Sequence, residues 1–259
     1  MQATHRLKLG FCAIALAFGA SLALMPATVV HAEEWSIGST RIEGSGKIEK
    51  QNRTVSNFNG VSIGVPAKVE LIQDNTEGVS IETDDNLLPQ IETVVERGEL
   101  KIRTLKHNLN MQTQTLNIVV RLKNIDRINL GGSGTILSNK LQASRLAVNL
   151  GGSGNVDIKT LDANELSIAL GGSGGMKTAG TVNSMSVAIG GSGKIDAGNL
   201  KAKLVDITIG GSGRLKVAAR DKLTLTVAGS GDVGYYGDPQ ISKTVIGSGS
   251  LKRLGEFPQ

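Results

Sequence analysis

The chain has 259 residues, 34 of them glycine, and carries a formal net charge of +5. Its single cysteine, Cys12, excludes a domain held together by internal disulfides. Aromatic residues make up only 3% of the chain, and the apolar residues are mostly Val, Ile and Leu, which favours strands and tight turns over helices.

Residues 1–32 have the layout of a secretory signal peptide. His5, Arg6 and Lys8 form a basic start, an apolar run of 17 residues follows at 9–25, and small residues lie around 30–32. We expect cleavage before Glu33 and export to the periplasm or the outer surface of a bacterium. An uncleaved anchor is the alternative, because a 17-residue run is near the lower limit for a spanning helix. No other stretch approaches this length, so we expect no membrane span after cleavage.

Short apolar runs with strand spacing occur through the first half of the chain, at 61–65, 69–71, 79–81, 100–102 and 116–120. Residues 84–89 are typical of a turn or one short helical turn that ends at Pro89. Gly44-Ser45-Gly46, flanked by Ile42 and Ile48, matches the spacing of a repeat in the second half. We therefore predict one copy of that repeat near the mature N-terminus.

In the second half, the tetrapeptide Gly-Gly-Ser-Gly recurs with its serines 18 to 20 residues apart. The last two copies begin with Ala228 and Ile246 in place of the first glycine. The repeated serines are Ser133, Ser153, Ser173, Ser192, Ser212, Ser230 and Ser248. A fixed period of this size indicates one structural unit stacked many times, as in solenoids.

Apolar residues keep fixed positions around these serines, and only Lys243 interrupts the series. They lie three residues before the serine (Leu130, Leu150, Leu170, Ile189, Ile209, Val227, Val245), five before it (Ile128, Val148, Ile168, Val187, Ile207, Leu225) and three after it (Ile136, Val156, Met176, Ile195, Leu215, Val233, Leu251). The alternation predicts strands with one buried face. Because one unit cannot bury that face alone, we expect equivalent strands to pair in parallel, about 4.8 Å apart, with the apolar positions stacked in internal ladders.

The predicted fold is all-β, a right-handed parallel β-helix (solenoid) with coils of about 20 residues and Gly-Ser-Gly corners. Coils of this length leave no room for crossover helices, which excludes a doubly wound α/β sheet. We expect a single domain at 33–259, with irregular coils at 33–120 that begin or cap the stack and regular repeats at 121–259. A separate small β domain in the first half is the alternative.

We interpret the seven serines as a structural corner ladder. Glycine would allow positive φ at a sharp corner and leave room where stacked corners exclude a Cβ atom. The serine hydroxyl can bond to neighbouring backbone or to the next serine. Valine at Gly151 or Gly171 is expected to clash and to destabilise neighbouring coils. A phosphate-binding loop needs Gly-Lys-Ser/Thr at the start of a helix, and residues 193–195 (GKI) do not fit that pattern.

No catalytic, cofactor or metal site is predicted. His107 is the only histidine after the expected cleavage point, too little for a histidine-based metal site or triad. Asp84 and Asp85 are adjacent and more typical of a turn cap than of acid–base catalysis. The other acidic candidates, Asp157, Asp196 and Asp206, are spread singly over the repeats. The only Trp and Tyr residues after the expected cleavage point are Trp35, Tyr235 and Tyr236, too few for an aromatic platform that binds sugar.

Charge is unevenly distributed along the chain. Residues 33–120 hold 9 Lys or Arg against 13 Asp or Glu, whereas 121–259 hold 17 against 10. A basic repeat region could attract an anionic surface such as lipopolysaccharide, acidic polysaccharide or DNA. The alternative, favoured by the interspersed acids, is that Lys and Arg keep the outer face soluble and block edge pairing. We expect no nucleic-acid partner.

Three further motifs lie at residues 58–63 (FNGVSI) leading to 69–73 (VELIQ), at 84–93 (DDNLLPQIET) and at 98–102 (GELKI). Together with the Gly-Ser-Gly copies they span about residues 40–251 and resemble the head GIN domain family. This is a bacterial domain of unknown function described as a "putative auto-transporter adhesin". The resemblance implies a β-helical fold and carries no established catalytic residues.

We therefore expect an exported, non-catalytic cell-envelope protein without a cofactor. It would be an adhesin-like binding or structural module that presents its solenoid surface to a glycan or a protein. A secreted carbohydrate-active enzyme, similar to polysaccharide lyases on the same fold, is the alternative. The chain ends at Gln259 without room for a membrane-inserted translocator, so we expect that it is not a complete autotransporter.

Overall fold

A computed structural model describes residues 40–106 and 108–258, so the predicted signal peptide, Trp35 and His107 lie outside the described residues. The described part contains strands and one 3-10 helix, η1 (Leu88–Gln90). The strands are β1 (Thr40–Glu43), β2 (Ile48–Arg53), β3 (Gly60–Ile63), β4 (Lys68–Gln73), β5 (Gly78–Asp84), β6 (Ile91–Glu96), β7 (Glu99–Thr104), β8 (Leu109–Gln112), β9 (Leu116–Leu122), β10 (Arg127–Leu130), β11 (Thr135–Ser138), β12 (Leu141–Leu150), β13 (Asn155–Leu170), β14 (Gly175–Ile189), β15 (Lys194–Ile209), β16 (Arg214–Gly229), β17 (Asp232–Tyr236), β18 (Gln240–Gly247) and β19 (Ser250–Gly255). No described helix is long and apolar enough to cross a membrane.

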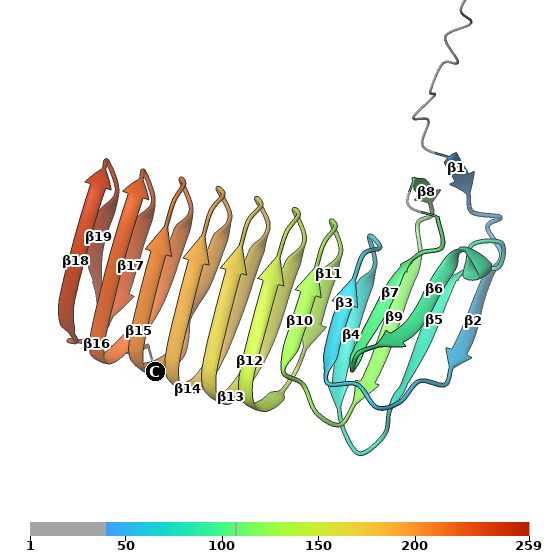
Figure 1. Ribbon diagram of the computed structural model, residues 1–259, viewed down its shortest axis with the longest axis horizontal. Helices are drawn as coiled ribbons and strands as arrows, with labels where there is room; N and C mark the ends of the chain where they lie inside the picture. Colours follow the sequence, from blue (N-terminus) through green and yellow to red (C-terminus); the bar gives the residue numbers. More distant parts are fainter. Residues whose placement is uncertain (1–39, 107, 259) are drawn as a thin grey trace, which may run out of the picture. The chain divides into compact units, whose positions relative to one another are not determined.

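The repeats form a β-solenoid in which each coil lies against the next (Figure 1). β12 pairs in parallel with β13, and Leu150 lies opposite Leu170, 20 residues later. The same parallel pairing continues from β13 through β14, β15 and β16 to β17 and β18. Each Gly-Gly-Ser-Gly segment links the strand segment before it to the one after it. The predicted all-β solenoid with coils of this length is confirmed, and its handedness stays a prediction.

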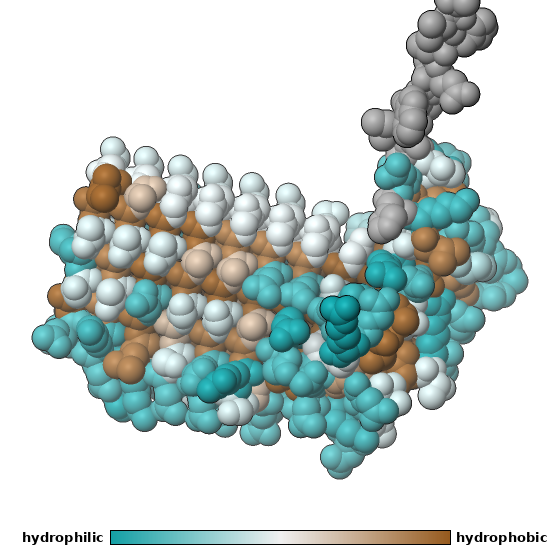
Figure 2. Space-filling view, in the orientation of Figure 1, coloured by the Kyte–Doolittle hydropathy of each residue, from teal (hydrophilic) through white to brown (hydrophobic). Residues whose placement is uncertain are grey.

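The predicted apolar ladders form the core. From Leu130 to Val227, the residues three before each serine are at most 2% exposed, and those five before it are at most 1% exposed. Figure 2 shows residues of like hydropathy aligned in rows along the stack. Burial of each such aliphatic side chain contributes about 1.5–3 kcal/mol, and every rung is covered by the next one.

The last coil, formed by β18 and β19, explains the one break in the ladders. Lys243 lies opposite Leu225 of the preceding coil. Leu225 is 1% exposed, whereas every residue of β18 is exposed. The lysine is tolerated because its ammonium group reaches water, and an inward-facing charge on an edge strand opposes the addition of further strands.

The glycines of the repeat are required for stacking, but not at the positions predicted. A Cβ atom added to Gly151 would meet no heavy atom within 4 Å, and one added to Gly171 would lie 3.9 Å from the Leu150 carbonyl oxygen. The predicted clash at these two glycines is therefore wrong. A Cβ atom on Gly172 would instead come within 3.0 Å of the Gly152 carbonyl oxygen in the preceding coil. Other glycines at the second and fourth positions of the tetrapeptide are similarly confined: Gly152, Gly154, Gly174, Gly191, Gly193 and Gly211.

Positive φ is not the reason for most of these glycines. No described glycine in the five copies from 131 to 213 has a positive φ. Gly229 and Gly247, in the last two copies, do have it, with φ of 149° and 122°. The stacked carbonyl groups, more than left-handed backbone, therefore account for glycine in the regular copies.

The first half of the chain joins the stack out of chain order. β3 and β4 pair in parallel with β10 and β11 on one side and with β7 and β9 on the other. Val61 thus lies between Leu100 and Ile128. Beyond β7 and β9 the pairing is antiparallel, through β6, β5 and β2 (Figure 1).

Gly44-Ser45-Gly46 is not a copy of the repeat, contrary to the prediction. It connects β1, which pairs with β8, to β2, which pairs antiparallel with β5. Asp84 accepts a hydrogen bond from the Gly46 amide at 2.6 Å, and Asp85 accepts one from the Ser45 hydroxyl at 2.6 Å. These two carboxylates hold the loop. Pro89 lies inside η1 and does not end it.

The hydrogen bonds of Asp84 also make the stability of the protein depend on pH. It is 4% exposed and accepts a hydrogen bond of 2.6 Å from the Thr113 hydroxyl. This bond, with that from Gly46, lowers the pKa of Asp84 below its ordinary value of 3.8. A pKa lowered by folding contributes stability above the ordinary pKa, and this is lost as pH falls through the lower, folded-state pKa.

We therefore expect Thr113→Val to raise the pKa of Asp84 and to shift the acid-unfolding midpoint to higher pH. Circular dichroism during an acid titration measures this midpoint. The exposed Thr226 provides the control substitution, Thr226→Val, which should leave the midpoint in place. Equal midpoints for the wild type and Thr113→Val would contradict the role given to Asp84.

Candidate functional site

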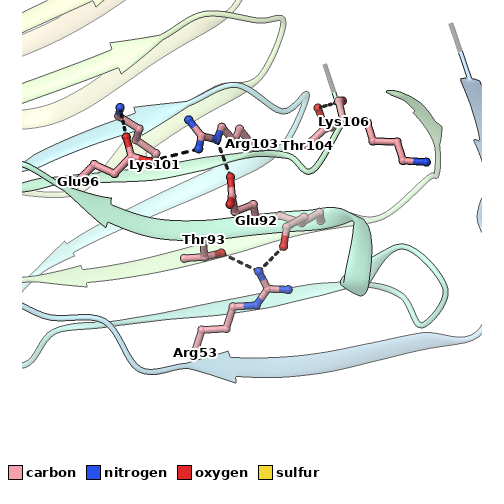
Figure 3. Close-up of polar contacts among 9 residues, drawn as sticks. Arg53, Glu92, Thr93, Glu96, Lys101, Arg103, Thr104 and Lys106 are labelled. Carbon is pink, nitrogen blue, oxygen red and sulfur yellow. Dashed lines mark hydrogen bonds and ion pairs between the residues drawn. The ribbon is translucent and has the colours of Figure 1, made fainter. Parts of the chain in front are cut away.

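One cluster of charged side chains lies on the hairpin of β6 and β7 (Figure 3). Arg103 pairs with Glu92 at 2.6 Å and with Glu96 at 3.3 Å, and Lys101 pairs with Glu96 at 2.6 Å. The bond from Lys101 lowers the pKa of Glu96, and the bond to Glu92 raises the pKa of Arg103. The charges of this cluster satisfy one another, so it fits a structural role.

Arg53 connects β2 to η1 and β6 through hydrogen bonds (Figure 3). Its guanidinium donates hydrogen bonds to the Ile91 and Leu88 carbonyl oxygens at 2.5 and 2.8 Å, and to the Thr93 hydroxyl at 2.7 Å. Partial burial lowers the pKa of Arg53. Its donors are used to close this end of the stack and are not directed at a ligand.

The seven predicted corner-ladder serines are all exposed and lie in the links between strands. The backbone bonds successive links together: the Ser192 amide donates to the Gly172 carbonyl oxygen and the Ser212 amide to that of Gly191, both at 3.2 Å. Within the described residues, none of the seven hydroxyl groups is hydrogen-bonded to protein. Their role as a structural ladder stays a prediction.

The acidic candidates are not all spread singly. Asp157 pairs with Lys177, which pairs with Asp196, so the two aspartates share one ladder with a lysine between them. Asp206 lies on a different side of the coil, opposite Thr224. In the part of the chain that the structure describes, no three His, Cys, Asp or Glu side chains are grouped to hold a metal ion.

A groove runs across successive coils, over strands β12, β13, β14 and β15. Its floor consists of Ala143, Ala163, Val182 and Ala202, which pair in register from β12 to β15. Polar residues flank each floor residue: Gln142, Asp162, Thr181 and Lys201 on one rim, and Ser144, Asn164, Asn183 and Lys203 on the other. Two adjoining hollows of about 840 and 410 Å³ make up this groove and share residues 162–164.

The half of the groove nearer β12 is rich in amide groups. Asn59, Asn124, Gln142 and Asn164 line it, and Asn183 donates a hydrogen bond to Asn164 across neighbouring coils at 3.1 Å. An amide both donates and accepts hydrogen bonds. This half therefore matches the chemistry of hydroxyl groups, which also do both.

The other half of the groove is basic. Lys201, Lys203 and Arg220 line it together with Phe257, which follows β19 in the chain. Arg220 pairs with Asp221 at 2.8 Å, and this pairing lowers the pKa of Asp221. Neither of the two lysines forms an ion pair with a described residue. The arrangement concentrates positive charge at one end of the groove.

The family comparison matches residues 57–239 to the family described as "Putative auto-transporter adhesin, head GIN domain". The chain belongs to the head GIN domain family. The match runs from just before β3 to just after β17 and includes every coil that supplies a floor residue of the groove. The description of the family as an adhesin implies a location at the cell surface.

Solved structures share this head GIN fold. A "putative adhesin" from Bacteroides fragilis is 26% identical, with a TM-score of 0.77, and the match covers 82% of this chain and 100% of that one. A "putative lipid binding protein" from Parabacteroides distasonis is 28% identical, with a TM-score of 0.72, and 83% and 100% of the chains are covered. A third, a "putative adhesin" from Parabacteroides merdae at 20% identity, TM-score 0.63 and coverage of 83% and 99%, shows the fold alone. The search of curated proteins found no match.

The groove of this head GIN protein was not predicted from the sequence. Its lysines were placed only within a generally basic region, and Phe257 was not identified at all. One signal was present: the triplets at 142–144, 162–164, 181–183 and 201–203 each place a small or aliphatic residue between two polar ones, once per coil. In the sequence alone, such a triplet is typical of any strand with alternating polar and apolar residues. Only the stacked coils bring the triplets together into a groove.

Proposed function

We propose that this head GIN protein is an exported, non-catalytic cell-envelope module that binds a linear glycan in the groove. The observation that carries this proposal is the repetition of the groove from coil to coil, with an alanine or valine as floor residue and two polar rims each time. A linear polymer lying along the stack would meet a comparable set of groups about every 4.8 Å.

The chemistry of the rims supports a polyhydroxylated ligand. Amide and hydroxyl groups bond to sugar hydroxyls in either direction, and each such bond contributes about 1 kcal/mol. The adhesin descriptions of the family and of the similar Bacteroides fragilis structure support a binding role at a surface. The binding energy would be spread over many weak contacts, so affinity should grow with the length of the glycan.

Two pairs of asparagines offer a matched test of the groove. Asn164 and Asn183 are hydrogen-bonded on its rim at 3.1 Å, and Asn129 and Asn149 are hydrogen-bonded on another side of the coils at 2.8 Å. We expect Asn164→Ala with Asn183→Ala to weaken glycan binding about tenfold, since about 1.4 kcal/mol of hydrogen bonding is lost. Asn129→Ala with Asn149→Ala should leave binding unchanged.

A glycan array followed by calorimetry on the glycans retained measures both effects. Loss of binding in both double variants, or in neither, would contradict the groove as the binding site. Incubation of the retained glycans with the protein, with and without calcium, should release no new reducing or unsaturated ends. Release of such ends would favour the carbohydrate-active enzyme predicted as the alternative.

A further inference from the structure

We infer that the glycan is anionic and that its acidic groups bind at the basic half of the groove, between Lys201 and Lys203. This inference rests on the proposed function and adds the chemical class of the ligand. It also assigns a direction to the groove, because the two halves differ in charge.

The two lysines are placed to grip one anionic group from both rims. They lie two residues apart on β15, so their side chains extend from the same face of the strand. Ala202 between them is 2% exposed and forms the floor. Neither ammonium group is paired with a described carboxylate, and two like charges on facing rims repel each other less when an anion lies between them.

The neighbouring charged residues leave this half of the groove with an excess of positive charge. Arg220 adds a third cation on the next coil, where it pairs with Asp221, and Asp162 is the one carboxylate among the residues that line this hollow. Asp162, the acidic member of the rims, lies two coils away, since it pairs with Thr181 and Thr181 pairs with Lys201. The chemistry of the lining therefore changes along the groove, from an amide-rich and partly acidic half to a basic half.

The same end supplies an apolar contact. Phe257 lines the basic half, and its ring is the apolar surface there against which a sugar ring would pack. Of the large exposed aliphatic residues, Leu204 follows Lys203 but lines a neighbouring hollow, and Ile241 and Ile246 lie on β18. A groove with polar rims and one aromatic residue fits a single glycan chain better than the flat, apolar surface that a membrane would require.

Two pairs of polymers test this class of ligand, because each pair shares a backbone and differs in charge. They are an oligogalacturonate and its methyl ester, and dextran sulfate and dextran. We expect the wild type to bind the charged member of at least one pair about fivefold or more tightly than its neutral partner at low ionic strength. Two exposed ion pairs of about 0.5 kcal/mol each account for this factor. The preference should fall with added salt.

Substitutions on β15 and β16 locate the effect. Lys201→Gln with Lys203→Gln should abolish the preference for the charged polymer while leaving thermal unfolding unchanged. Lys194→Gln with Lys216→Gln removes the same two charges from another side of the coils and should keep the preference. Equal losses in both double variants would show a general charge effect and overturn the site.

The remaining outcomes separate this inference from the proposed function. Equal binding of the charged and neutral polymers would overturn the inference and leave the glycan-binding function standing. Binding of none of the four polymers, nor of any glycan on the array, would overturn both. Binding to vesicles containing anionic phospholipid, with no binding to the soluble polymers, would overturn the anionic glycan in favour of a membrane surface.

Discussion

Gly172→Ala is expected to lower the free energy of unfolding by about 3 kcal/mol or more. The added methyl group would come within 3.0 Å of the Gly152 carbonyl oxygen and within 3.2 Å of the Gly151 carbonyl oxygen. Both are backbone atoms of the preceding coil, so no side chain can rotate away to make room. The cost should therefore be at the upper end of that for overpacked sites.

Gly171→Ala provides the control within the same tetrapeptide. Its nearest neighbour would be the Leu150 carbonyl oxygen at 3.9 Å, an ordinary contact, so the expected change is within about 0.5 kcal/mol. Urea unfolding measures both variants, and hydrogen exchange should show lost protection in the coils on either side of residue 172 only for Gly172→Ala. Similar unfolding energies for the two variants would show that the links are not stacked as described.

Leu225→Lys is expected to cost several kcal/mol. Leu225 is 1% exposed and lies between Ile207 on one side and Lys243 on the other. An ammonium group placed there would lose its water, find no described carboxylate on the ladder, and lie one rung from another positive charge. We expect the C-terminal coils to unfold at lower urea concentration than the rest, which fluorescence of Tyr235 would follow.

The reverse substitution, Lys243→Leu, tests why lysine occupies the end of the ladder. It buries no charge, so the free energy of unfolding should not fall. It adds apolar surface beside Ile241 and Val245, which are already 40% and 37% exposed, and removes the inward charge. Sedimentation velocity should then show association that increases with protein concentration. A cost below about 1 kcal/mol for Leu225→Lys, or a monomeric Lys243→Leu variant, would contradict this explanation.

The regular coils could be predicted from the sequence because each rung repeats the chemistry of the previous one. Fixed apolar positions around Ser153 or Ser173 define the strands, the buried face and the length of a coil. Lys243 stood out for the same reason, although only the exposure of β18 showed why a charge is tolerated there.

The order of the coils in space could not be predicted in the same way. The strand pattern of β3 does not specify that it pairs with β10, more than 60 residues later, as well as with β7. Spacing alone likewise favours a repeat at Gly44-Ser45-Gly46, whereas two aspartates hold this loop and the strand that follows it, β2, pairs antiparallel with β5. Which glycine is confined depends on the path of the backbone in the preceding coil, so the sequence alone does not distinguish Gly172 from Gly151 or Gly171.

The groove depends both on the repeat pattern, which the sequence shows, and on the way the coils stack in space, which it does not. Residues at 142–144, 162–164 and 201–203 come together only when the coils are stacked in register, and Phe257 arrives from beyond the last strand. No short window of sequence contains more than four of the lining residues. A search for small residues flanked by polar ones at the period of the repeat could have found the floor and the rims.

Backbone amide NMR shifts of the protein titrated with an oligogalacturonate test the glycan-binding groove most directly. The changes should be confined to residues 142–144, 162–164, 181–183 and 201–203, be largest at the last of these, and be absent from the links at 151–154 and 171–174. Changes concentrated in the links, or a spectrum that does not respond to this or any glycan retained on the array, would contradict the account.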